Sequence, residues 1–373
     1  AADFDDLIIS TGQLIAVTGY ANAFITKGVV FGQADSGIRA DSLQFSLNEG
    51  YIFVDASNQP KYQPTAGADG VQLPFGTVSL SALEVTELLN QALSIANKAR
   101  AQIRKPLGSQ ARVTIAVVDS QGNNLGMVRT LDAPVFGADV ALQKARTATL
   151  FSSIDAASFF QSMTQLTNYL NPDLTLYRTI DIADYVEAAQ LFISPDTLNN
   201  GIAFTDRAGG NLSRPFFPDG IDANVHGPFS KSFSNNEWSI FSTGLQLDLV
   251  MNQMVAHLLY ALDVSNVDVS QNCVANPSAR VANGIQIFPG SVPIYRNNIL
   301  VGAIGVSGDG VDQDDMIAFL AVHQAGEKLN TLNNAPSELR ADNIVIKQQR
   351  LRYVQCPQSP FINNEQQLVC KGK

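Results

Sequence analysis

Residues 112–151 contain the feature that most limits what this chain can fold into, which is an apolar hairpin followed by a helix. β-branched residues fill much of 113–118, turn-forming Ser, Gly and Asn occupy 120–123, and 125–128 is apolar again. Two apolar runs on either side of such a turn predict a β-hairpin. The chain is therefore expected to contain an antiparallel sheet.

A helix with a face of small residues is predicted to follow this hairpin. Pro134 suits its first turn, where a proline leaves no backbone N–H unbonded. Small residues then recur at helical spacing, which lets the helix backbone approach a sheet closely. They are Gly137, Ala141, Ala145 and Ala148.

A second group of elements lies nearer the C-terminus. The three strands predicted there span 284–288, 292–295 and 300–307, with a hairpin turn at 296–298. A helix is predicted to run from Asp312 to about Leu329, because Asp312 and Asp315 are acidic residues that favour a helix N-terminus. Its segment 316–322 is apolar on every side, so the helix is expected to be buried on more than one face.

A further helix is predicted over residues 81–105. Ser81 and Glu84 have the spacing of a capping box, and an apolar face extends as far as Ile103. Helices that alternate with hairpins in this order predict an α+β fold, in which an antiparallel sheet is flanked by helices.

Five stretches within these elements resemble the GlcG/HbpS-like family of heme-binding proteins. In order they read VVDSQGNNLG, VRTLDAP, KARTA, VPIYRNNILVGAIGVSG and VDQDD. The resemblance covers about 79–152 and 283–329 and is to the long, extracytoplasmic members of the family. It implies a profilin-like core and heme binding, with heme degradation attributed to part of the family.

The rest of the chain is predicted to divide around this core. Residues 1–75 are interpreted as a β-rich N-terminal arm or small module, which completes a sheet of this chain or of a neighbour. The core at 79–329 is interrupted by an insertion at 152–272, and 330–373 form a tail. Within the insertion, helices are predicted at 182–192 and 245–262, and a strand with a loop at 202–214.

Composition excludes several classes of function. A formal net charge of -10 argues against a grip on nucleic-acid phosphates or on an anionic membrane surface. No apolar run approaches the roughly 18 to 20 residues that span a bilayer. With 45% hydrophobic residues, the chain can instead bury a sizeable core.

The cysteines and the N-terminus point to an exported protein. Cys356 and Cys370 lie in a loop-rich tail, where a disulfide between them is favoured over two free thiols. Cys273 is more simply a small buried residue than a nucleophile. The chain starts with Ala-Ala-Asp and is rich in Asn, Gln and Ser, so we expect a mature periplasmic or extracellular protein whose signal peptide has been removed.

Histidines are the candidate ligands for a heme iron, because one imidazole suffices for axial ligation. His226 is the first choice, since Phe216, Phe217 and Phe229 are close to it in sequence and aromatic walls suit a flat macrocycle. His323 and His257 are the others. For each of the three, a hydrogen-bonded structural or surface histidine is the competing interpretation.

Basic and acidic clusters give two further candidate sites. Lys144, Arg146 and Arg129 could pair with heme propionates or with a small organic acid. They could equally form internal salt bridges to Asp119, Asp132 or Asp139. The acidic loop could bind calcium, although such clusters more often cap a helix; its residues are Asp309, Asp312, Asp314 and Asp315.

Three functions remain open from the sequence. Heme binding ranks first, and a structural subunit that assembles outside the cell ranks second. The latter would be a homo-oligomer, and could form fibres if the N-terminal arm joins a neighbour's sheet. A binder of a small organic acid ranks third. No metalloprotease, P-loop or serine-hydrolase motif is present, and no catalytic residue can be assigned.

Overall fold

The computed structural model describes most of the chain. Backbone and side chains are described at 36–67, 78–163, 181–218, 225–231, 239–241, 259–260, 262–267 and 279–373, together with the backbone of six short strands. These strands pair as β1 (Ile8–Ser10) with β2 (Gln13–Ile15), β6 (Val71–Leu73) with β7 (Gly76–Val78), and β10 (Leu166–Leu170) with β11 (Tyr177–Ile180).

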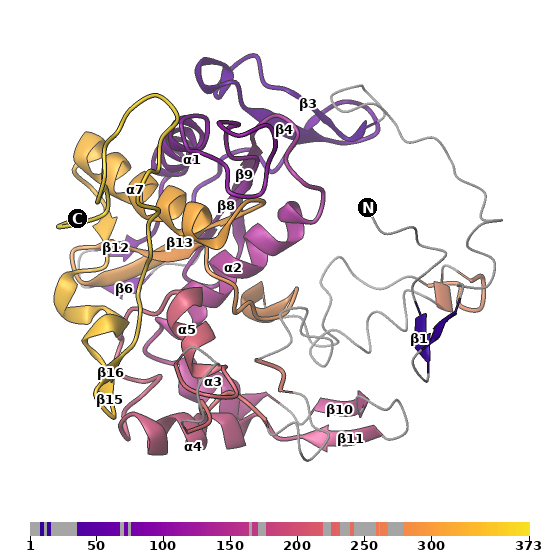
Figure 1. The fold of residues 1–373 in the computed structure, drawn as a ribbon, viewed down its shortest axis with the longest axis vertical. Coiled ribbons are helices and arrows are strands. Elements are labelled where there is room, and N and C mark those ends of the chain that lie inside the picture. The colour runs from indigo at the N-terminus through magenta and orange to yellow at the C-terminus, as the bar shows by residue number, and fades with distance from the viewer. Residues whose placement is uncertain are drawn as a thin grey trace.

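An eight-stranded sheet forms the centre of the molecule (Figure 1). Its strand order is β14-β12-β13-β8-β9-β4-β3, with β5 paired to β4, and every one of these pairings is antiparallel. The strands are β3 (Ile38–Ala40), β4 (Tyr51–Val54), β5 (Pro60–Lys61), β8 (Thr114–Asp119), β9 (Asn124–Arg129), β12 (Ser291–Arg296), β13 (Ile299–Ser307) and β14 (Asn333–Asn334). The predicted α+β class is confirmed.

Both hairpins predicted from the sequence are present, and strand β13 of one pairs with strand β8 of the other. Asp119 shapes the turn of the first hairpin. Its Oδ1 accepts hydrogen bonds from the backbone N–H groups of Gln121 and Asn123, each at 2.9 Å. Such an Asx-type turn is the reason why the sequence signal at 120–123 was reliable.

The strand predicted at 284–288 is wrong, because these residues form no strand. Gln286 explains the difference. Its Oε1 accepts the backbone N–H groups of Ile287 and Phe288, at 2.9 and 3.1 Å. Local side-chain bonds of this kind compete with strand pairing for the same backbone groups.

Helix α2 (Gly137–Phe151) packs closely on one face of the sheet, as its small residues predict. A Cβ atom at Gly305 of β13 would lie 2.1 Å from the backbone oxygen of Ala141 and 2.6 Å from the nitrogen of Ala145. Only glycine fits so near a helix backbone. Pro134 lies in the turn just before the helix, where its carbonyl accepts the N–H of Gly137 at 3.1 Å.

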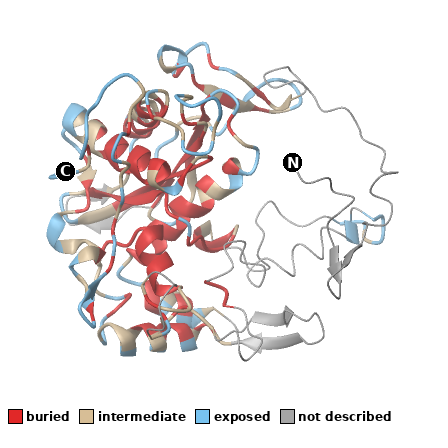
Figure 2. Ribbon diagram, in the orientation of Figure 1, coloured by how far each residue is buried: buried red, intermediate tan, exposed pale blue. Residues whose placement is uncertain are grey.

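Helices α1 (Ala82–Ala96) and α7 (Val311–Leu329) pack against each other and cover the other face. Successive side chains of strand β8 point to opposite faces of the sheet, so the strand packs against the helices on both faces. Its residues Ile115 and Val117 belong to the main apolar core, whereas Ala116 and Val118 pack in the smaller clusters with α2. Buried residues accordingly run through the sheet and its helices (Figure 2).

Helix α1 starts as predicted but ends earlier. The capping box of Ser81 and Glu84 is present. The predicted extension to residue 105 is wrong, because Ala99 forms a β-bridge with Phe361 of the tail. This backbone pairing replaces further helical bonds, and Ile103 is left 57% exposed.

In its described parts the insertion contains the helices α3 (Ala156–Ser162), α4 (Ala183–Phe192) and α5 (Asp206–Leu212), joined by turns and loops. Helix α4 confirms the helix predicted at 182–192. The strand and loop predicted at 202–214 are wrong, because Thr205 caps a helix there: its Oγ1 accepts the N–H of Ala208 at 3.3 Å. The helix predicted at 245–262 falls almost wholly outside the described residues.

The N-terminal arm and the tail both join this core. Strand β4 pairs with β9 through Tyr51 and Arg129, so residues 38–61 extend the sheet of this same chain. The predicted disulfide between Cys356 and Cys370 is present. Short elements complete the described structure: η3 (Ser46–Asn48), η5 (Ala279–Val281), η6 (Ser337–Leu339), η7 (Ala341–Asn343), β15 (Val345–Ile346) and β16 (Gln349–Arg350). Among the described helices, none has the length and apolarity to cross a bilayer.

Candidate functional site

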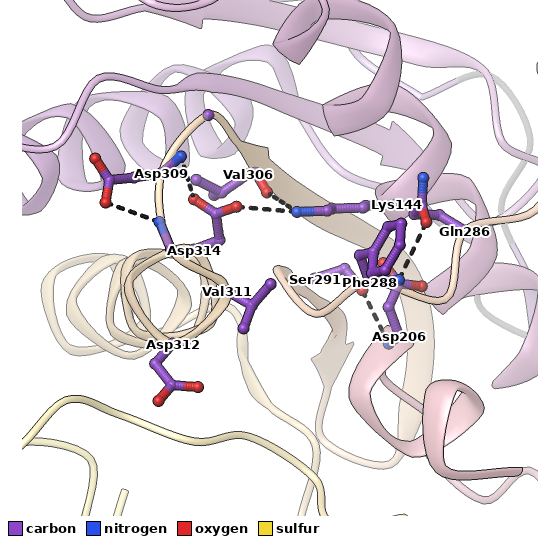
Figure 3. A network of polar contacts seen from close by, with 12 residues as sticks. Lys144, Asp206, Gln286, Phe288, Ser291, Val306, Asp309, Val311, Asp312 and Asp314 are labelled. Carbon is purple, nitrogen blue, oxygen red and sulfur yellow. Dashed lines mark hydrogen bonds and ion pairs between the residues drawn. The ribbon is translucent and has the colours of Figure 1, made fainter. Parts of the chain in front are cut away.

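A buried ion pair joins the middle of α2 to the start of α7 (Figure 3). Lys144 Nζ lies 3.0 Å from Asp314 Oδ2 and donates a second hydrogen bond to the carbonyl of Val306 at 2.9 Å. Both charged side chains are only 2% exposed. Gly290 makes room for them, because at its φ of +135° a Cβ atom would lie 2.6 Å from Nζ.

Burial opposes the ionisation of the Asp314 carboxyl group. Removal from water raises the pKa of Asp314 to about 7, although the charge of Lys144 and its hydrogen bond act in the opposite direction. Breaking one partner would leave the other uncompensated away from water.

A second ion-pair group docks the insertion onto the same helix. Arg207 of α5 donates from Nε to Asp315 Oδ2 at 2.5 Å and from Nη2 to Asp312 Oδ1 at 2.7 Å. The tail joins there too, since the N–H of Gln355 donates to Asp315 Oδ2 at 3.0 Å. One guanidinium fork thus fixes α5 against α7.

Asp206, the residue before Arg207, is fully buried. Its backbone N–H donates to Ser291 Oγ at 3.2 Å, and neither carboxylate oxygen has hydrogen-bond geometry to a described residue. Burial raises its pKa well above the ordinary value; Ser291 and Lys144 only partly offset this effect. Burial therefore favours the neutral form of the Asp206 carboxyl group.

The other two predicted cations also bind inside the protein. Arg146 donates to the carbonyl of Gly122 at 2.9 Å and to Asn283 Oδ1 at 2.7 Å. Arg129 is 1% exposed and donates to the carbonyl of Ala133, and burial lowers its pKa to about 10. Both guanidinium groups hold loops of this chain together.

The four acidic residues of the predicted calcium loop hold different groups. Asp309 Oδ1 accepts the N–H of Gln102 at 2.7 Å, whereas Asp312, Asp314 and Asp315 bind the cations described above. In the described part of the chain, no group of three or more His, Cys, Asp or Glu residues could hold a metal ion. Calcium at this loop stays a prediction.

His226 is exposed, and its ring stacks on Phe216 with centroids 5.5 Å apart. The other predicted aromatic walls lie elsewhere: Phe217 and Phe229 are buried, packing on Phe192 and Phe241 respectively. Their side chains serve the core of the insertion. His257 lies outside the described residues, and iron ligation by His226 stays a prediction.

His323 lies in the second half of α7 and lines an open pocket of about 750 Å³. Its Nε2 is 3.3 Å from Glu327 Oε1 and 3.0 Å from Lys373 Nζ. Partial burial and the charge of Lys373 lower its pKa, so the ring is neutral at neutral pH. A neutral imidazole is the form that binds metals.

Arg340 stands between this pocket and a second one of about 310 Å³. Its guanidinium lies over the rings of Phe319 and Tyr353, at 5.3 and 5.4 Å from their centroids. It also donates to the carbonyls of Ala335 and Lys373, each at 2.8 Å. These contacts fix the orientation of the guanidinium group, which can then bind a carboxylate.

Sequence reasoning missed three of these groups. Asp206 and Arg207 were read as part of a strand and loop, although Thr205 was a cap signal. Arg340 had no local signal, because its partners include Phe319 of α7 and Tyr353 and Lys373 of the tail. The pocket at His323 is likewise built from segments that no motif connects.

Comparison with protein-family models finds a match for two segments of the chain. The sequence model of the family described as "Haem degrading protein HbpS-like" matches residues 88–190 and 253–323. Fold and site together define an α+β protein with an antiparallel sheet, a closed polar interior and an open histidine pocket. The chain belongs to the HbpS-like family over those two segments.

Two solved structures have also been compared with it. The crystal structure of a PduOC:heme complex is 16% identical, covers 66% of this chain and 94% of that chain, and has a TM-score of 0.27. The Klebsiella pneumoniae protein ORFY is 17% identical, covers 69% of this chain and 98% of that chain, and has a TM-score of 0.29. No curated protein matches the chain.

Proposed function

We propose that this protein binds haem and that His323 is the protein ligand to the iron. The observation that carries the proposal is an imidazole on the wall of an open pocket of about 750 Å³, where partial burial lowers its pKa. That volume lies within the range of roughly 300 to 1,000 Å³ typical of small-molecule and cofactor sites. Membership of a family described as haem degrading supports the same ligand.

The residues around His323 fit such a group. Pro336 lines the pocket as a partly exposed apolar residue, while Leu332 and Ala335 lie beneath it, 5% and 1% exposed. Arg340 supplies positive charge that suits a propionate. Bound iron would supply Lewis-acid and redox chemistry, while the protein's own groups would hold the macrocycle and its carboxylates.

Proton binding should compete with haem at this site. The pKa of His323 is lowered by burial and by Lys373, so its ring stays neutral in more acidic solution than an ordinary histidine does. Affinity for hemin should accordingly persist as the pH falls through the ordinary histidine range. It should weaken only below the lowered pKa.

An absorbance titration with hemin tests the assignment. We expect a saturable Soret shift in the unmodified chain and in His226→Ala and His257→Ala, with loss of the shift in His323→Ala. Loss in His226→Ala instead would move the site to the exposed loop. The absence of a shift in the unmodified chain would overturn the proposal.

A subunit that assembles outside the cell is the second candidate. Three apolar residues just before α2 favour it, since Leu131, Val135 and Phe136 are 41%, 84% and 59% exposed. Val135→Ser with Phe136→Ser should then lower the mass measured by light scattering. The same measurement on a chain without 1–70 tests whether the N-terminal arm mediates assembly.

The proposal that a small organic acid binds at Lys144 has less support. Lys144 is buried and already engaged by Asp314, so an acid would have to displace that carboxylate. Titration with acetate or benzoate, monitored by calorimetry with Lys144→Ala as the comparison, tests it. Export of the protein is also a proposal, and it is supported by the disulfide, which forms in oxidising compartments.

A further inference from the structure

We propose that the disulfide between Cys356 and Cys370 is a redox-controlled latch, which holds the end of the tail over His323. The inference rests on the proposed haem site and names a control of access to it. The tail segment after Cys370 is here called the strap; it comprises residues 371–373. In the oxidised protein, Lys373 of the strap contacts the imidazole of His323. In the reduced protein, the strap moves away from that imidazole.

The strap competes for the atom that an iron would use. Lys373 Nζ lies 3.0 Å from His323 Nε2, and Arg340 Nη2 donates to the carbonyl of Lys373 at 2.8 Å. Gly372 and Lys373 both line the pocket of His323. A ligand on Nε2 therefore requires Lys373 to move away.

The latch is placed to control that movement. Cys370 lines the pocket of His323, and both Cys356 and Cys370 line the smaller pocket beside it. Both cysteines are only partly buried, so a thiol reductant can reach them. Reduction would break the S–S bond, with two electrons and two protons supplied by a dithiol that is itself oxidised to a disulfide.

Little besides the disulfide holds this part of the tail. Residues 363–368 are all exposed, and the hydrogen bond described for their backbone N–H groups is from Gln366 to its neighbour Asn364. Val369 is the one buried side chain between 363 and 373. Segments with few buried contacts open at low free energy once a crosslink is removed.

The test compares the oxidised full chain with the double variant Cys356→Ser/Cys370→Ser. Hydrogen exchange of the Lys371 amide, whose N–H donates to the carbonyl of Leu368 at 2.9 Å, should become at least about tenfold faster in the variant. The pKa of His323, followed by NMR of its ring protons, should rise because the nearby charge of Lys373 is lost. Hemin should bind about fivefold more tightly, the factor expected from one hydrogen bond that no longer has to be broken.

A matched pair of variants separates the strap from the disulfide. Lys373→Gln keeps the disulfide and should reproduce the rise in the pKa of His323, whereas Lys371→Gln should not. Unchanged exchange and an unchanged His323 pKa in the double serine variant would overturn the latch even if hemin binds. If hemin binds in neither redox state while the pKa and the exchange change as expected, the haem site fails and the latch stands.

Discussion

Charged groups lie at both ends of helix α7, and the two ends differ in whether those groups can change partners. At the N-terminal end, Asp314 and Asp315 are buried and bound to Lys144 and Arg207. Nearer the C-terminal end, His323 is partly exposed beside a pocket. Buried pairs fix the position of the helix, while a partly exposed imidazole can exchange its partner for a ligand.

The largest effect should come from breaking the buried pair at the N-terminal end. Lys144→Ala leaves Asp314 without its cation, so we expect the free energy of unfolding to fall by about 3 to 5 kcal/mol. Chemical denaturation measures this loss. Lys371→Ala, at an exposed lysine, is the matched control and should cost less than about 0.5 kcal/mol; equal losses in both would contradict a structural role for the pair.

Gly290→Ala should have the next largest effect. Its Cβ would lie 2.5 Å from the carbonyl oxygen of Val306 and 2.6 Å from Lys144 Nζ, at a φ of +135°. We expect a loss on the order of 3 kcal/mol, since backbone strain alone accounts for roughly 1 to 3 kcal/mol. Gly108→Ala, which has positive φ but open space, measures the strain by itself; a loss as large as that of Gly290→Ala would show that close packing at Gly290 contributes nothing.

The buried acids should also make the stability of the protein depend on pH, which a partly exposed group such as His323 would do less. The folded-state pKa values of Asp314 and Asp206 are raised by burial, to about 7 for Asp314, so these two carboxyl groups bind more protons in the folded chain than in the unfolded chain above about pH 4. Their contribution to stability should therefore fall as the pH rises from about 4 towards 7.

Asp206→Asn should reduce that fall by about 1 kcal/mol or more, because an amide cannot ionise. Urea denaturation at a series of pH values measures the slope, with the exposed Asp184→Asn as the control. Identical slopes in Asp206→Asn and the unmodified chain would rule out the buried acid as a source of the pH dependence.

The smallest effect on stability should come from His323→Ala. Its contacts with Glu327 and Lys373 are partly exposed, and such pairs contribute little. We expect a change below about 0.5 kcal/mol in chemical denaturation. A loss of several kcal/mol would make His323 a structural residue and remove the difference between the two ends of α7.

Local patterns predicted much of the fold. The turn at Asp119 and the small face of α2 are encoded within a few residues, and both were found where they were expected. Strand 284–288 was mispredicted, because a glutamine side chain took the backbone N–H groups that a neighbouring strand would need. Apolar pattern alone does not reveal such a competitor.

The candidate site was harder to predict, because its contacts join distant parts of the chain. Lys144 and Asp314 are 170 positions apart, and Arg207 is 108 positions from Asp315. Closeness in sequence misled in the opposite direction at His226, where Phe217 and Phe229 turn into the core. Ion pairs between residues on either side of the insertion depend on tertiary packing, which the spacing of residues in the sequence does not reveal.

The most direct test of the haem site is to locate the iron. Crystals of the full chain soaked with hemin should give one strong anomalous difference peak at the iron edge, directly beside His323 Nε2 in the pocket lined by Arg340. A single peak beside His226, or at a position away from α7, would contradict the account.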